Sequence, residues 1–115
     1  MSPTQSTTEP EIVKQPETAK DFITRGWILH VQGDDAKSET DFLKALSMDP
    51  RSAEAAYGLG MALKGQAHTK DAIQAFEKAV SLIKDHAMED EPIRATMTRR
   101  MAEAQISMLQ SNSPS

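Results

Sequence analysis

The sequence predicts an all-α protein of five helices, on three observations. Between residues 18 and 110 the apolar residues recur at spacings of three and four, and no stretch of strand length alternates with period two. Gly, Pro and capping residues divide this region into five segments. The chain also repeats itself with a period of 34 residues, as in Ala19 and Ala53. Such a period is typical of stacked helical hairpins.

The five helices follow in chain order from their start and stop residues. They are expected at about 18–32, ending at Gly33; from Asp34 or Asp35 to 48; from a Ser52 cap to about 65; from a Thr69 cap to about 85; and from Asp90 or Glu91 to about 110. Pro92 falls in the first turn of the last helix, where a missing N–H leaves no hydrogen bond unmade. Residues 1–17 and 111–115 are polar and predicted to be disordered tails around one domain, 18–110.

Composition excludes several classes of protein. The 115 residues contain no Cys, so disulfides, thiolate metal sites and a cysteine nucleophile are excluded. A net charge of −4 argues against sequence-independent nucleic-acid binding. No apolar run is long enough to span a membrane, and residues 1–20 lack the pattern of a secretory signal. A cytoplasmic protein is therefore expected.

The internal repeat pairs residues 19–52 with residues 53–86. Average composition would give about two identities by chance. Clearly more are found, among them Ala19/Ala53, Gly26/Gly60, Leu29/Leu63, Phe42/Phe76, Lys44/Lys78, Ala45/Ala79 and Ser47/Ser81. The glycines are expected where two helices cross closely, and the phenylalanines as large plugs between helices. The helix at 91–110 would cap the second unit or begin a degenerate third one.

At these residues the sequence resembles the tetratricopeptide repeat (TPR) family, whose 34-residue pattern places a small residue, an aromatic and a Pro at fixed spacing. Matching positions are Phe22, Gly26, Leu29, Ser38, Phe42, Ala45 and Pro50 in the first unit, and Ala56, Leu59, Gly60, Leu63, Ala72, Phe76 and Ala79 in the second. Arg25 and Lys84 depart from the pattern, at a Leu and a Pro position. The resemblance implies a helical solenoid that binds proteins in a concave groove lined by the first helix of each unit.

A second apolar stripe on each of those first helices would then face the groove. Aromatic residues and Met are enriched at binding surfaces. The candidate groove residues are Lys20, Ile23, Trp27, His30, Tyr57, Met61 and Lys64. Polar margins would be formed by Lys20, His30 and Lys64, opposite Glu54.

Other readings of the same residues stay open. Trp27 would be core if it packs on the third helix, and Tyr57 and Met61 would bridge to the fifth. The groove would be filled by the chain's own Ile12 and Val13, or by a second copy. Met residues of the fifth helix, in the stripe Ile93, Met97, Met101, Ala104 and Met108, are expected to be core, with a solvent-exposed binding face as the alternative.

No motif supports catalysis, a cofactor or a metal site. Gly58-Leu59-Gly60 is not followed by the Lys of a phosphate loop, and the three His lack metal-ligand spacing. Some members of the TPR family hold the C-terminal carboxylate of a ligand with Lys, Asn and Arg along the groove. The matching positions here are Ile23, Trp27 and Gly58, so a clamp of this kind is not expected.

The expected function is therefore a non-catalytic module or scaffold that binds an apolar or amphipathic peptide or helix. The alternatives are a self-associating structural protein, as a homodimer, and a small secretion-type chaperone.

Overall fold

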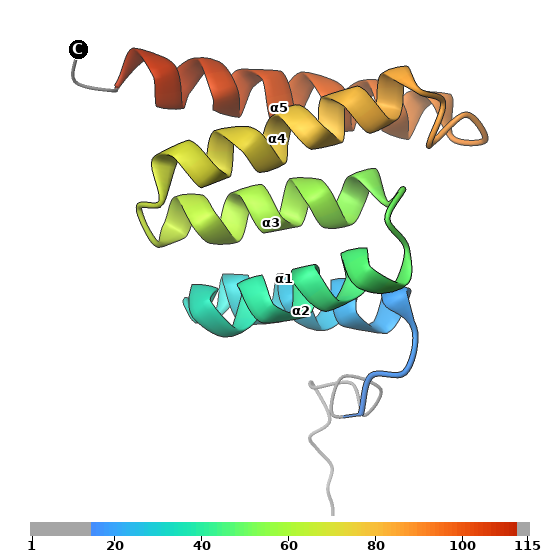
Figure 1. Ribbon diagram of the computed structural model, residues 1–115, viewed down its shortest axis with the longest axis vertical. Coiled ribbons are helices and arrows are strands. Elements are labelled where there is room, and N and C mark those ends of the chain that lie inside the picture. The colour runs from blue at the N-terminus through green and yellow to red at the C-terminus, as the bar shows by residue number, and fades with distance from the viewer. Residues whose placement is uncertain (1–14, 113–115) are drawn as a thin grey trace, which may run out of the picture.

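The structure is a computed structural model and describes residues 15–112. Five helices are present in this part of the chain, and no strand: α1 (Ala19–Val31), α2 (Asp35–Met48), α3 (Ala53–Gly65), α4 (Thr69–Lys84) and α5 (Pro92–Ser111). Helices α1 and α2 form one antiparallel hairpin, α3 and α4 form a second, and α5 packs on α4 (Figure 1). The predicted all-α solenoid of five helices is confirmed. The tails expected at its two ends lie mostly outside the described residues.

Side-chain caps fix the starts of the first three helices. Thr18 Oγ1 accepts a hydrogen bond from the Asp21 N–H at 3.1 Å, and the Asp21 carboxylate accepts one from the Thr18 N–H at 3.2 Å. These two bonds form a capping box. Asp34 caps α2 and Ser52 caps α3 in the same general way. The choice between Asp34 and Asp35 is thereby decided for Asp34.

The fourth helix begins differently from the prediction. Thr69 is its first residue and not its cap; the N-cap is His68, which makes no side-chain cap hydrogen bond. The cause is the preceding turn, in which Ala67 has φ 63° and the His68 N–H bonds to the Leu63 carbonyl at 2.9 Å. Gly33, one repeat earlier, has φ 88°. The two turns are thus the same, although alanine is strained in this conformation.

Two phenylalanines hold the hairpins together. The rings of Phe42 and Phe76 are fully buried, as are Ala45 and Ala79 nearby. A Cβ atom added to Gly60 would lie 2.6 Å from the Phe76 ring. A Cβ added to Gly26 of α1 would lie 2.9 Å from the Phe42 ring, and one added to Gly58 of α3 would lie closer to this ring still. The predicted close helix crossings at Gly26 and Gly60 are confirmed, because only hydrogen in place of a side chain leaves room for the rings.

The prediction for the fifth helix was right about its limits and wrong about its buried face. Ile93 is 77% exposed, Met97 57%, Met101 43% and Met108 47%. The buried side instead contains Thr98 and Ala102, followed by the half-buried Ile106 and Leu109. Because Ala102 is small, α5 can approach α4 closely on that side. The stripe of Met residues is left facing outward.

Candidate functional site

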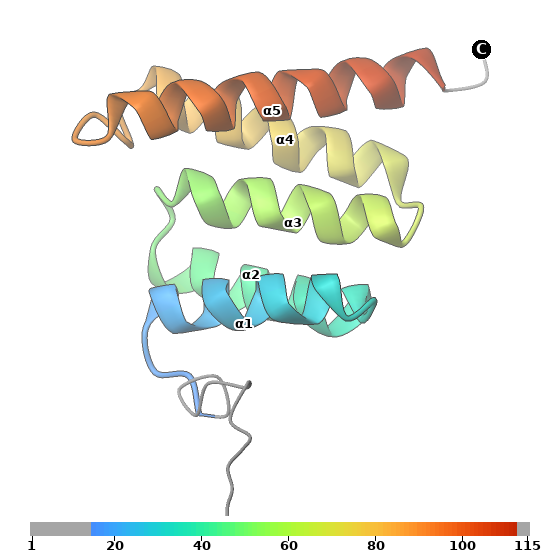
Figure 2. The same cartoon turned by 180° about the vertical axis from the view of Figure 1, so that it is seen from behind.

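One face of the molecule is formed by α1, α3 and α5, with α2 and α4 behind them (Figure 2). A hollow of about 320 Å³ lies across these three helices. Its lining residues come from all three: Trp27 from α1, Glu54 and Tyr57 from α3, and Arg94, Met97, Thr98 and Met101 from α5. We call this hollow the groove. Most of the surface that lines the groove is apolar, so an apolar side chain that binds there is removed from water.

A chain of aromatic contacts connects the groove with the core. The Trp27 ring lies 5.9 Å from the Tyr57 ring and 5.1 Å from the Phe42 ring, between ring centroids. Tyr57 lies 5.4 Å from Phe76 in turn. Trp27 is half-buried, whereas Tyr57 is only 9% exposed. Trp27 therefore belongs to both environments: one side of its ring packs on the core, and the other side lines the groove.

Polar contacts tie α3 to α5 at both ends of the groove. Arg94 of α5 donates to Glu54 Oε1 at 2.8 Å and to Glu91 Oε2 at 3.2 Å. The hydrogen bond with Glu91 and the charge of Glu54 raise the pKa of Arg94 above its usual value. Toward the other end, Lys64 Nζ donates to Gln105 Oε1 at 2.6 Å. These bridges hold α5 against α3.

Tyr57 has a perturbed environment. Burial raises the pKa of its hydroxyl, and a hydrogen bond with the Gln105 side chain opposes this shift. The neutral phenol is thus the form that the fold favours. Gln105 belongs to α5 and also accepts a hydrogen bond from Lys64. The hydrogen bond between Tyr57 and Gln105 thus joins α3 to α5. This is the bridge to the fifth helix that the sequence left open for Tyr57.

The predicted groove residues fall into three groups. Trp27 and Tyr57 line the groove. His30 lies beside Trp27, at 5.9 Å between ring centroids, and its Nδ1 is 2.5 Å from the Asp35 carboxylate. Others lie on the same helices without lining the groove: Lys20 is exposed, Ile23 is half-buried, Met61 packs against the core, and Lys64 bonds to Gln105.

Sequence reasoning missed the third wall of the groove. Met97, Thr98 and Met101 of α5 complete it. The stripe that contains Met97 and Met101 was visible in the sequence, but it was expected to be core and an exposed binding face was only the alternative; Thr98 was not part of it. Periodicity alone does not tell which of two neighbouring stripes on a helix is buried, so no sequence signal could have placed these residues in the groove.

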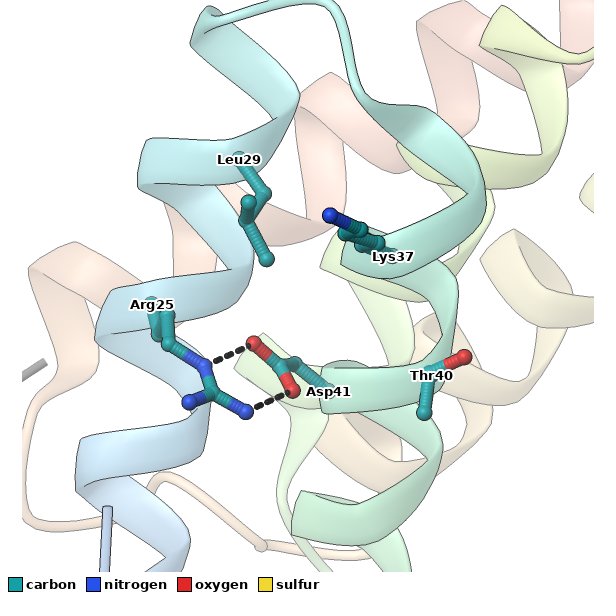
Figure 3. Close-up of a pocket in the computed structure, with 5 residues that line it drawn as sticks. All are labelled: Arg25, Leu29, Lys37, Thr40 and Asp41. Atoms are coloured by element: carbon teal, nitrogen blue, oxygen red, sulfur yellow. Dashed lines mark hydrogen bonds and ion pairs between the residues drawn. The ribbon is translucent and has the colours of Figure 1, made fainter. Parts of the chain in front are cut away.

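A second hollow lies between α1 and α2, and its residues explain the departure of Arg25 from the repeat pattern. Arg25 donates to Asp41 through Nε at 2.7 Å and through Nη2 at 2.8 Å (Figure 3). Leu29, Lys37 and Thr40 line the same hollow. Asp41 is only 3% exposed, and the hydrogen bonds with it raise the pKa of Arg25 above its usual value. A bidentate ion pair thus stands where the pattern has apolar packing.

Within residues 15–112, no three His, Asp or Glu side chains come together as ligands of a metal ion would. No helix among those described is long and apolar enough to cross a membrane.

Comparison with known proteins identifies the second hairpin. Residues 53–86 match the family model described as the tetratricopeptide repeat. This range is the second predicted unit, and it contains α3 and α4. No curated protein matches the chain. Repeats of this family in general mediate protein–protein interactions and are in general not catalytic.

Proposed function

Since the chain contains a tetratricopeptide repeat within a stack of helical hairpins, we propose that it is a non-catalytic module that binds an apolar or amphipathic segment of another protein in the groove. The observation that supports this most directly is the groove itself. Trp27, Met97 and Met101 present partly exposed apolar side chains from two helices to one hollow. Core side chains behind Trp27 hold its ring in place, so binding needs little reordering of this anchor.

The chemistry of the groove favours an amphipathic helix or an extended peptide. Met side chains are flexible and polarisable, so Met97 and Met101 can adapt to the shape of an apolar ligand. Glu54 and Arg94 form a paired, charged margin at one end. On α1, the exposed Lys20 would offer a basic group to acidic residues of the ligand, and His30 would contribute a polar margin that is already paired with Asp35. A ligand with an apolar face and polar flanks matches this arrangement.

Seven groove residues follow from the sequence, and we retain them as the proposed contact surface together with the α5 wall. Within this surface we assign the anchor to Trp27. Tyr57 acts chiefly as the support beneath it, because its side chain is nine-tenths buried. Lys64 and Met61 hold α3 against its neighbours and would contact only a long ligand.

The test is selection of peptides against the purified protein, followed by binding to matched variants. Trp27 is the one tryptophan of the chain, so its fluorescence reports the groove alone. We expect selected peptides to shift the Trp27 emission to shorter wavelength. Met97→Glu places a charge in the groove at an exposed position and is expected to weaken binding by about 5- to 100-fold, equivalent to about 1–3 kcal/mol. Trp27→Ala is expected to do the same.

The control is Leu43→Ala, which removes an exposed apolar side chain from α2, outside the groove. It is expected to bind like the unmodified protein. Circular dichroism checks that Trp27→Ala keeps its helices. Peptides that bind Met97→Glu and folded Trp27→Ala as tightly as the unmodified protein would disprove the groove proposal.

A further inference from the structure

The outward face of α5 is not explained by the fold or fully by the groove. Four large apolar side chains project from one side of this helix, Ile93, Met97, Met101 and Met108, each at least 43% exposed. Met97 and Met101 reach the groove at one edge, whereas Met108 lies outside it. A contiguous apolar stripe of this kind on a polar helix marks an interaction surface.

We propose that this face pairs with the same face of a second copy of the chain, α5 against α5 in antiparallel orientation. Residues Met97, Met101, Ala104 and Met108 are spaced by four, three and four, which is the seam spacing of paired helices. In the register that sets Met101 opposite Ala104 of the second copy, Met97 lies opposite Met108. A two-fold axis then repeats every contact.

This register makes the face complementary to itself. Each central Met101 meets an Ala104, a large side chain against a small one, on both sides of the axis. A parallel pairing would instead place Met101 beside Met101 of the second copy. The alternation of large and small residues is therefore an argument for a second copy as the occupant, in the antiparallel orientation.

The charged residues of α5 leave the seam free. Arg100 is exposed and flanks the seam on the side that points away from α4. Glu103 lies farther around the helix, where it accepts a hydrogen bond from Arg99 at 3.1 Å. No charged side chain therefore interrupts the four seam positions, and the seam keeps its charged residues at its margin.

The size of the face sets the expected strength. One helix of 20 residues contributes the seam, so the interface falls at the small end of specific interfaces, below about 1,200 Å² in total. A weak dimer follows, with a dissociation constant on the order of micromolar. The dimer and the groove share Met97 and Met101, so their tests must use different residues.

Sedimentation over a dilution series across the micromolar range tests the dimer. We expect the unmodified chain to change from monomer to dimer. Met108→Glu buries a charge in the seam without touching the groove and is expected to stay monomeric. Lys78→Glu, on the exposed surface of α4, is the control and is expected to dimerise normally.

An exchange of the large and small seam residues tests the register. Ala104→Met sets Met against Met101 of the second copy and is expected to weaken the dimer about tenfold. The double variant Met101→Ala/Ala104→Met restores a large side chain against a small one in the antiparallel register, and it is expected to regain the original affinity.

Three results would overturn the proposal: a monomer at every concentration, a Met108→Glu variant that dimerises normally, or an Ala104→Met variant that dimerises as tightly as the unmodified chain. Peptide binding by Met108→Glu is measured in parallel. Because Met108 lies outside the groove, this variant separates failure of the dimer from failure of the groove.

Discussion

Gly60→Ala tests directly whether the close crossing of α3 and α4 at a glycine stabilises the second hairpin. A Cβ at this position would lie 2.6 Å from Cδ1 and Cε1 of Phe76 and 2.8 Å from Cζ. Carbon atoms pack best at about 3.5–4.0 Å. The added methyl group is therefore about 1 Å too close to three ring atoms. Phe76 is completely buried, so its ring has no open space into which it can move.

Two effects of opposite sign decide the magnitude. Overpacking of a tight core costs about 1–3 kcal/mol, and the clash here is at the severe end. Replacing Gly by Ala inside a helix returns about 1 kcal/mol of backbone preference. We expect a net loss of about 1–2 kcal/mol, which for a domain of this size lowers the melting temperature by about 5–15 °C.

The measurement is thermal and urea unfolding followed by circular dichroism. Phe76→Leu is the matched background, because it removes Cε1 and Cζ, two of the three ring atoms that the methyl group would meet, and the Cδ atoms of Leu can rotate away from it. In that background Gly60→Ala is expected to be nearly neutral, so that the double-mutant cycle gives a coupling of about 1–2 kcal/mol. A Gly60→Ala variant that melts at or above the unmodified protein, or a cycle without coupling, would refute the close-crossing argument.

Three further predictions concern ionisable and capping groups. The pKa of Tyr57, the one tyrosine, is expected above its ordinary value of about 10, and phenolate absorbance measures this pKa. Because the tyrosine of the unfolded chain already ionises at about pH 10, the folded state loses stability as the pH rises above that value. Tyr57→Phe should abolish this dependence of stability on pH. Thr18→Ala should cost about 0.5–2 kcal/mol. The pKa of Asp21 is lowered by the backbone N–H groups of Glu17 and Thr18 and also by the Thr18 side chain. Because Thr18→Ala removes only the side-chain hydrogen bond, it should bring this pKa part of the way toward normal in an NMR titration; the Asp21 contribution is present above about pH 3.9 and is lost as pH falls through the lowered value. Arg25→Leu should cost about 1–3 kcal/mol in urea unfolding because buried Asp41 loses two hydrogen bonds, and Arg25→Leu/Asp41→Leu should recover most of it; an equal loss in both would contradict the ion-pair reading.

Local chemistry accounts for most of what could be predicted. Ser52 caps a helix because its side chain satisfies a free N–H within three residues, so the cap is readable from adjacent positions. The repeat placed Phe42 and Phe76 correctly, since two copies of one hairpin must solve the same packing problem. Thr69 was misassigned as a cap because the turn before it depends on Ala67 adopting a left-handed conformation, which alanine does not favour.

The sequence by itself determined the five helices, the two hairpins and the glycine–phenylalanine crossings, because each depends on residues within one repeat. Tertiary structure alone decided the rotation of α5 about its axis, since two neighbouring stripes of that helix could have been buried with similar gain. That rotation buried Ala102 and turned Met97 and Met101 toward the groove. Only the folded chain brings Trp27 within reach of this third wall, because the contact joins helices far apart in sequence.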